Sequence, residues 1–311
     1  MTEKTLAEVL VCPKGHGRLR ETGNGLECPE HGGTYHRNTY GYYDFTPGGG
    51  VAGFESTSAE YAEDQRENWE RFFVDYLEPW LAREPYERVL EVGCGLGMGI
   101  RSLLANGKDA YGIDIPCLSR FWADIGNCPD RFFCAGGAEM PFPDGAFDAA
   151  YSLGVIEHIG TAVGHYTLEA DFREARQAFA DEILRVTRPG GRILISCPNK
   201  SFPIDIAHAP ADAATPEGTM RIRRWLYDRT GMTVHLPFGK YHLLSFGEVK
   251  DLFRKAGSVR PLPNRGYFAF NRFGSGPFGL LKPLVGGYVN HLPGPLRGTC
   301  LNPFVIAEVR R

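Results

Sequence analysis

The stretch RVLEVGCGLGMGI, Arg88–Ile100, decides the fold. An apolar run containing the acid Glu91 is followed by glycines at positions 93, 95, 97 and 99. A strand that ends in a glycine-rich turn and opens a helix leaves backbone N–H groups accessible to a ligand. The sequence therefore predicts a ligand-binding strand–turn–helix unit at this point.

Strand-like and helix-like segments alternate on the C-terminal side of this unit. This order implies parallel strands joined by helical crossovers, so the expected fold class is α/β, a Rossmann-like sheet with helices on both faces. An amphipathic helix or helix pair is expected before it, from 57 to 83. The expected strands are 109–115, 130–136, 147–153, 192–197 and 303–310, and the expected helices lie near 118–125, 171–187 and 245–256.

Composition narrows the class of protein. The 311 residues carry a net charge of -3, without the basic excess of a general nucleic-acid binder. No apolar run approaches the length of a membrane span, and the first residues lack a signal-peptide core. Several of the eight cysteines lie in strand-like runs, which is typical of buried thiols in a reducing compartment. We therefore expect a cytoplasmic protein.

The glycine spacing distinguishes between two cofactor classes. A dinucleotide fingerprint requires G-x-G-x-x-G, but Met98 stands where the third glycine belongs. S-adenosylmethionine (SAM) carries an ammonium group and a ribose, which acidic side chains bind well. Glu91 can hold the amino group, and Asp114, 23 residues further on, can accept hydrogen bonds from both ribose hydroxyls. The spacing favours SAM.

Four motifs carry a family resemblance: LEVGCGLG (90–97), YGIDI (111–115), AEMPFPDGAFDAAYSLGVIEHI (138–159) and LRVTRPGGRILIS (184–196). In order and spacing they resemble the motifs of class I SAM-dependent methyltransferases, and most closely the subgroup acting in quinone and natural-product biosynthesis. The resemblance covers about 89–199.

The resemblance implies a set of cofactor-binding positions. The family often places an acid for the adenine amino group where this chain has Gly137. The implied positions are the loop Gly93, Cys94, Gly95 and Gly97 around the methionine part, Asp114 at the ribose, Ile115, Ala138 and Glu139 at the adenine, and Leu153 lining the site.

Methyl transfer from a sulfonium is an in-line displacement, so positioning contributes most of the catalysis. An acceptor that must lose a proton benefits from a histidine base. His158 follows the fourth strand, where the acceptor should approach, although a structural or capping role also fits it. His165 and Tyr166 lie in an unusually long connection, which either overhangs the methyl group or is a solvent-exposed loop.

A long aromatic and histidine-containing segment, 199–243, interrupts the strand–helix alternation. Loops of this length in compact domains are usually functional, so we expect an acceptor-binding cap. Its basic run, 221–224, is either a solvated helix face or a contact for an anionic group. The apolar segment 278–292 is expected to form a buried cap helix rather than an interfacial one.

The N-terminal segment carries two metal-ligand pairs, Cys12/His16 and Cys28/His31, separated by eleven residues. It resembles the small zinc-ribbon domains that accompany some SAM methyltransferases. Those use C-x2-C pairs, whereas here Gly15 stands at the second cysteine position. Two thiolates and two imidazoles complete a closed structural zinc site. The alternative is a degenerate ribbon that folds without metal.

These inferences divide the chain into a zinc-ribbon-like module (1–46), a linker with helices (47–84), a SAM-binding core (85–200), an inserted cap (201–243) and a C-terminal part (244–311). The leading hypothesis is methyl transfer from SAM to O, N or C of a small molecule, with no nucleic-acid partner. One alternative is a cyclase or other non-methylating catalyst on the same fold. Another is modification of a protein or RNA recruited by the N-terminal module. The sequence carries no indication of the oligomeric state.

Overall fold

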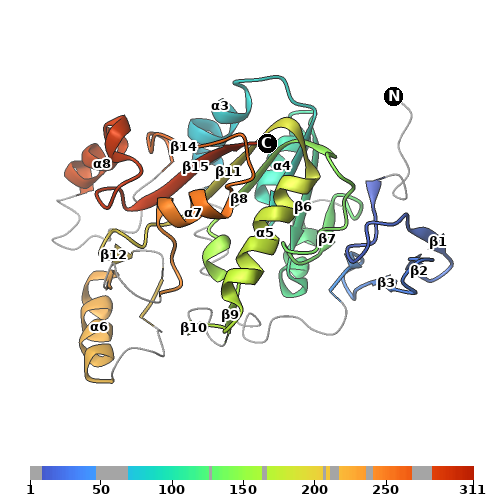
Figure 1. Ribbon diagram of the computed structural model, residues 1–311, viewed down its shortest axis with the longest axis horizontal. Coiled ribbons are helices and arrows are strands. Elements are labelled where there is room, and N and C mark those ends of the chain that lie inside the picture. Colours follow the sequence, from blue (N-terminus) through green and yellow to red (C-terminus); the bar gives the residue numbers. More distant parts are fainter. Residues whose placement is uncertain are drawn as a thin grey trace.

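The computed structural model describes residues 9–46, 69–125, 128–162, 167–205, 208–210, 217–235, 241–267 and 282–311. A twisted sheet forms its centre (Figure 1). Neighbours β7, β6, β5, β8 and β11 run parallel, and β15 lies antiparallel between β11 and β14. Their bounds are β7 (Phe132–Cys134), β6 (Asp109–Asp114), β5 (Arg88–Val92), β8 (Phe147–Leu153), β11 (Thr187–Pro198), β15 (Phe304–Arg310) and β14 (Ser258–Pro261).

Helices cover both faces of this sheet, so the predicted Rossmann-like α/β class is confirmed. Phe179 and Val249 belong to the apolar core on one face, whereas Leu77, Ile100 and Trp122 belong to the core on the other. The first face carries α5 (Phe172–Val186) and α7 (Phe246–Leu252), and the second carries η2 (Phe73–Leu77), α3 (Glu78–Leu81), α4 (Met98–Ala105) and η3 (Pro116–Ile125).

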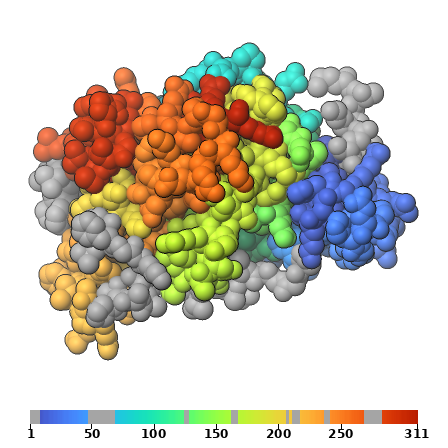
Figure 2. All heavy atoms as spheres, in the orientation of Figure 1, coloured from blue at the N-terminus to red at the C-terminus, as the bar shows by residue number. Residues whose placement is uncertain are grey.

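The N-terminal residues continue the central sheet. Four short strands, β1 (Arg20–Thr22), β2 (Gly25–Glu27), β3 (Thr34–Arg37) and β4 (Tyr43–Asp44), extend it beyond β7, where Asp44 pairs in parallel with Cys134. Leu10, Tyr35 and Phe45 share one buried core with Phe133 of β7. Figure 2 shows this N-terminal part lying against the side of the molecule. It is therefore joined to the central sheet through backbone pairing and a common core.

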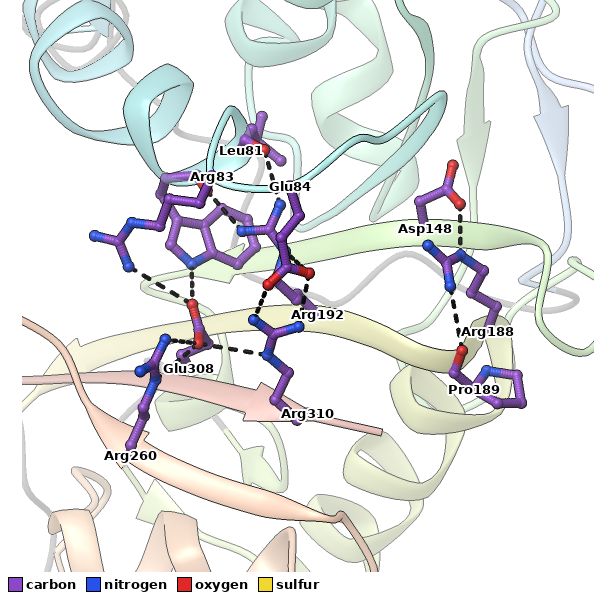
Figure 3. Close-up of polar contacts among 11 residues, drawn as sticks. Leu81, Arg83, Glu84, Asp148, Arg188, Pro189, Arg192, Arg260, Glu308 and Arg310 are labelled. Carbon is purple, nitrogen blue, oxygen red and sulfur yellow. Dashed lines mark hydrogen bonds and ion pairs between the residues drawn. The ribbon is translucent and has the colours of Figure 1, made fainter.

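A network of charged side chains closes the amino ends of the parallel strands (Figure 3). Glu308 of β15 is fully buried and accepts hydrogen bonds from Trp80 Nε1 at 2.8 Å and Arg260 Nε at 2.8 Å. Arg192 donates to the carbonyl oxygens of Trp80 and Leu81, each at 2.8 Å. The network fastens α3 to β11, β15 and β14.

The expected cap contains β12 (Ile204–Asp205), α6 (Glu217–Thr230) and β13 (Thr233–Val234). β12 and β13 pair, while α6 buries none of its residues and stands out from the molecule in Figure 1. Short elements complete the fold: η4 (Ile156–His158), β9 (Thr161–Ala162), β10 (Thr167–Leu168), α8 (Lys282–Asn290) and η7 (Gly294–Leu296).

The prediction of a buried helix over 278–292 is wrong for the residues that the structure covers. In α8, Leu284 is 71% exposed and Tyr288 is 46% exposed, whereas Val289 and the following Leu292 are buried. The apolar composition of this segment therefore did not predict whether its side chains are buried. Among the described helices, none is long and apolar enough to cross a membrane.

Candidate functional site

The glycine turn joins β5 to α4. Its first two glycines, Gly93 and Gly95, have very different surroundings. Gly93 (φ +81°) lies so close to Val155 that a Cβ there would be 2.2 Å from a Val155 methyl carbon. Gly95 (φ +52°) faces open space, because a Cβ there would meet no atom within 4 Å. Gly97, also at positive φ, forms the N-cap of α4. The turn therefore leaves bare backbone beside Gly95 for a ligand.

Asp114, at the end of β6, is fixed by the same turn. Its Oδ2 accepts from the Gly95 N–H at 2.6 Å and its Oδ1 from the Ile115 N–H at 2.7 Å. Each carboxylate oxygen has two lone pairs, so each can still accept one ribose hydroxyl. Burial raises the pKa of Asp114 to about 6, and the two N–H groups oppose this rise.

Glu91 lies beneath the first turn of α4. Its Oε2 and the Tyr151 hydroxyl lie together under Gly99, where a Cβ would be 2.4 Å from each. Both atoms are buried, and neither forms a hydrogen bond of normal geometry with any described residue. Burial raises the pKa of Glu91 well above its usual range, which the nearby Tyr151 hydroxyl partly offsets. A buried acceptor of this kind fits a ligand ammonium group.

The positions predicted to meet the adenine follow β6 and β7, and Leu153, predicted to line the site, ends β8. Ile115, Ala138 and Leu153 are partly buried, and Glu139 is exposed. Gly137 replaces the acid of the family pattern for a steric reason, because a Cβ there would be 2.6 Å from the ring of Phe179.

Two buried side chains, Cys94 and Trp122, pack against the glycine turn. Cys94 is buried with its Sγ over Gly112, so its contribution to the site is its backbone. Trp122 of η3 is fully buried and donates from Nε1 to the Gly95 carbonyl at 2.8 Å. Sequence reasoning missed Trp122. Only its place in the helical segment after Asp114 hinted at such a role.

A second group of polar side chains lies next to the glycine turn. His158, in η4, is three residues beyond Val155, which contacts Gly93. His158 Nε2 lies 3.3 Å from His208 Nε2, and His208 Nδ1 lies 2.9 Å from Asp205 Oδ2. The His242 ring is 4.9 Å from that of His208, centroid to centroid. Side chains from the expected cap therefore surround the predicted base.

The buried position of this group changes its electrostatics. Burial raises the pKa of Glu157 to about 7, although the neighbouring His208 opposes the rise. Burial, and then the nearby His208, lower the pKa of His242, which is neutral as a result. Arg176 of α5 donates to the carbonyl oxygens of Glu157 at 3.1 Å and His242 at 2.6 Å. This guanidinium fastens two segments of the group together.

The remaining predicted catalytic residues, His165 and Tyr166, lie outside the described residues.

The N-terminal structure gathers three of the four predicted metal ligands. Donor atoms of Cys12, Cys28 and His31 lie within 4.8 Å of one another. His16 turns away, and its Nε2 is 3.7 Å from Glu182 Oε1. The His31 ring occupies the place of a side chain at Gly15, where a Cβ would be 1.8 Å from the ring. His31 thus fills the space of the cysteine that the usual ribbon has at position 15.

Hydrogen bonds favour the thiolate form of Cys12. Its burial alone would raise the pKa, but the Tyr35 hydroxyl and the backbone N–H groups of Gly15 and Lys14 lower it overall. Such donors around a cysteine suit metal ligation.

Comparison with known proteins agrees with this geometry. Residues 90–195 match the model of a family described as "Methyltransferase domain". A demethylmenaquinone methyltransferase of Beutenbergia cavernae is 32% identical over 129 residues, which are 41% of this chain and 46% of that protein. A probable tocopherol O-methyltransferase of Oryza sativa is 31% identical over 167 residues, which are 50% of this chain and 39% of that protein.

The chain thus spans less than half the length of these relatives. A solved SAM-dependent methyltransferase of Thermotoga maritima, a possible histamine N-methyltransferase, is 15% identical. The alignment covers 83% of this chain and 97% of that one, with a TM-score of 0.45. Residues 90–195, with the glycine turn and Asp114, therefore match a methyltransferase domain on a Rossmann-like α/β sheet.

Proposed function

We propose that the chain is an enzyme that transfers a methyl group from SAM to an O, N or C atom of a small molecule. The observation that carries the proposal is the open backbone at Gly95 beside the anchored carboxylate of Asp114. This pair offers a surface for the methionine part and a fork for the ribose. It lies within the segment that matches a methyltransferase domain.

The buried oxygens of Glu91 and Tyr151 fit the other polar end of SAM. An ammonium group there would find an acceptor that no described side chain occupies. Ile115, Ala138, Glu139 and Leu153 are proposed to line the adenine and the rest of the cofactor. The protein's contribution to the displacement is then to align donor and acceptor and to exclude water.

The acceptor is proposed to enter over His158. Val155, three residues before this histidine, contacts Gly93 of the glycine turn. His208 of the cap contacts His158, and Asp205 contacts His208. His158 is the first candidate for the base, and His165 and Tyr166 remain candidates from the connection after it. Because two relatives carry the names of a demethylmenaquinone and a tocopherol methyltransferase, we propose an acceptor of the quinone or natural-product type. The cysteines in strand-like runs support the proposal of a cytoplasmic enzyme.

The N-terminal module is proposed to hold a structural zinc ion. Cys12, Cys28 and His31 supply three ligands, which is a soft thiolate-rich set suited to zinc. His16 completes the set only if its side chain leaves Glu182. Zinc analysis of the purified chain, compared with a Cys28→Ser variant, tests this: we expect the variant to hold one zinc ion fewer per chain.

A transfer assay tests the main proposal. Purified protein, methyl-labelled SAM and small-molecule fractions of an extract are incubated, and labelled products are identified by mass spectrometry. A labelled product that disappears with Asp114→Ala supports methyl transfer and gives the mass of the acceptor. Binding of S-adenosylhomocysteine without any labelled product would favour a non-methylating catalyst instead.

A further inference from the structure

The side chains around η4 that include His158, His208 and Glu157 supply the donor atoms of a metal site. Glu157, His158 and His208 offer one donor atom each, and these atoms lie within 4.8 Å of one another. Two imidazoles and one carboxylate form a set that binds Zn²⁺ or Fe²⁺ and leaves positions open for another ligand. Mg²⁺ and Ca²⁺ prefer oxygen donors.

The spacing of the two imidazoles matches a shared ion. His158 Nε2 and His208 Nε2 are 3.3 Å apart. Two nitrogens at about 2.0–2.1 Å from a tetrahedral ion are separated by about 3.4 Å. The distance between the two nitrogens is therefore compatible with one ion bound between the rings.

Asp205 prepares His208 for that role. Asp205 Oδ2 lies 2.9 Å from His208 Nδ1, and as the acceptor of this hydrogen bond it holds the proton of His208 on Nδ1. The lone pair of His208 then lies on Nε2, on the side of His158. Asp205 is 1% exposed, so the pair is shielded from water. This carboxylate–histidine arrangement is the usual outer support of a metal-binding histidine.

Glu157 supplies an independent indication of a ligand. It is 1% exposed, and its Oε2 has no hydrogen-bond partner among the residues that the structure describes. Burying a carboxylate oxygen without a partner is costly, and a cation at this point would offset that cost. The charge of Arg176 acts on this carboxyl from nearby, but its hydrogen bonds go to the carbonyl oxygens of Glu157, Ile159 and His242.

We propose that Glu157, His158 and His208 bind a divalent transition-metal ion, with Asp205 orienting His208. Binding of the ion does not depend on the proposed function. Resting on that function, the ion's open position would take a hydroxyl oxygen of the acceptor and ease loss of its proton to a water molecule that enters with the acceptor; His158 would then serve as a ligand of the ion in place of the base. The ionised oxygen then attacks the methyl carbon, and the C–S bond breaks with its electron pair on sulfur.

Cobalt substitution tests the site in the full chain. Purified protein is stripped with a chelator and titrated with Co²⁺, whose visible bands report an N/O site. Co²⁺ bound to the cysteines of the N-terminal module also absorbs in the visible and adds a near-ultraviolet charge-transfer band, so the titration is made in the Cys28→Ser background. There we expect one visible-absorbing Co²⁺ per chain without that near-ultraviolet band, lost when His208→Ala is added.

Conservative variants keep the test decisive if His208→Ala does not fold. Glu157→Gln should weaken Co²⁺ binding at least about tenfold, and Asp205→Asn about 10–100-fold. His291→Ala, which alters an exposed histidine at the end of α8, is the matched control and should bind as the wild type.

S-adenosylhomocysteine calorimetry on the same samples separates the two proposals. Binding of the nucleoside with no visible cobalt band overturns the metal site and means that His158 and His208 share a hydrogen bond. The same conclusion follows if Glu157→Gln and Asp205→Asn bind Co²⁺ as tightly as the wild type. A visible band without nucleoside binding supports the metal site and contradicts the proposed methyl transfer.

Discussion

Buried carboxylates lie at both ends of the parallel strands, but the two ends differ in the hydrogen-bond partners of these groups. At the amino ends, Glu308 is surrounded by protein donors, Trp80 and Arg260 among them (Figure 3). At the carboxyl ends, Glu91 and Glu157 are as deeply buried, yet each keeps an oxygen without a hydrogen-bond partner in the described structure.

This difference separates carboxylates that stabilise the fold from carboxylates that are available to a ligand. A buried charge costs several kcal/mol unless something compensates it. At one end of the sheet the chain itself supplies the compensation. At the other end the compensation is left to a ligand, so the two ends should respond oppositely to mutation and to ligand.

The largest expected effect is at the amino end. Glu308→Gln removes the charge that Arg260, Arg83 and Arg310 face, and it turns an amide toward Trp80. We expect a loss of about 3 kcal/mol in the free energy of unfolding, measured by denaturant titration. Affinity for S-adenosylhomocysteine should stay unchanged. A large loss of affinity would mean that the amino ends of the strands also contribute to ligand binding.

Its control is an exposed ion pair on the face of α5. Asp181 Oδ2 contacts Lys255 Nζ at 2.8 Å, with both side chains partly exposed. Asp181→Asn should cost less than about 1 kcal/mol.

The next effect is on binding at the carboxyl end. Asp114→Asn replaces a carboxylate that can accept two ribose hydroxyls by an amide that can accept fewer. We expect the affinity for S-adenosylhomocysteine to fall about 30-fold, or about 2 kcal/mol, by calorimetry. Asp109→Asn, at the opposite end of β6, is the control and should leave the affinity unchanged.

A smaller effect follows from pH. The pKa of Asp114 is raised from its ordinary 3.8 to about 6 by burial, so the ionised form is disfavoured in the free protein. Low pH therefore favours the protonated form of Asp114 in the free protein, whereas binding of the ribose requires the ionised form. Affinity for S-adenosylhomocysteine should rise about tenfold from pH 5 to pH 7.

The Asn variant isolates that pH effect. Asp114→Asn should show little change in affinity over the same range. An equal rise in the variant would assign the dependence to another group.

The smallest effect on stability comes from the turn. Gly95→Ala places a methyl group at φ +52° in open space, which costs about 1 kcal/mol of backbone strain. Gly107→Ala, at φ +72° and equally open, should cost the same. Only the Gly95 variant should also lose nucleoside affinity, and equal affinities would place the ligand elsewhere.

Local motifs were predictable from the sequence, and distant assemblies were not. The strand, glycine turn and Asp114 follow one another within a short segment, so spacing alone located them. His158, Asp205 and His208 meet only after the cap folds back on the sheet, and Arg176 joins them from α5. No local pattern encodes that meeting.

The N-terminal module and α8 show the same limit. Spacing suggested His16 as a metal ligand, but its backbone, at φ +56°, places the ring by Glu182 while His31 fills the space at Gly15. Composition suggested burial of α8, but tertiary structure covers only one side of it.

Calorimetric titration of the wild-type chain with S-adenosylhomocysteine is the decisive measurement for the proposed SAM site. We expect one nucleoside bound per chain, with affinity reduced by Asp114→Asn and unchanged by Asp109→Asn. Absence of binding by folded wild-type protein, or equal loss of affinity with both variants, would rule out a SAM site at Asp114.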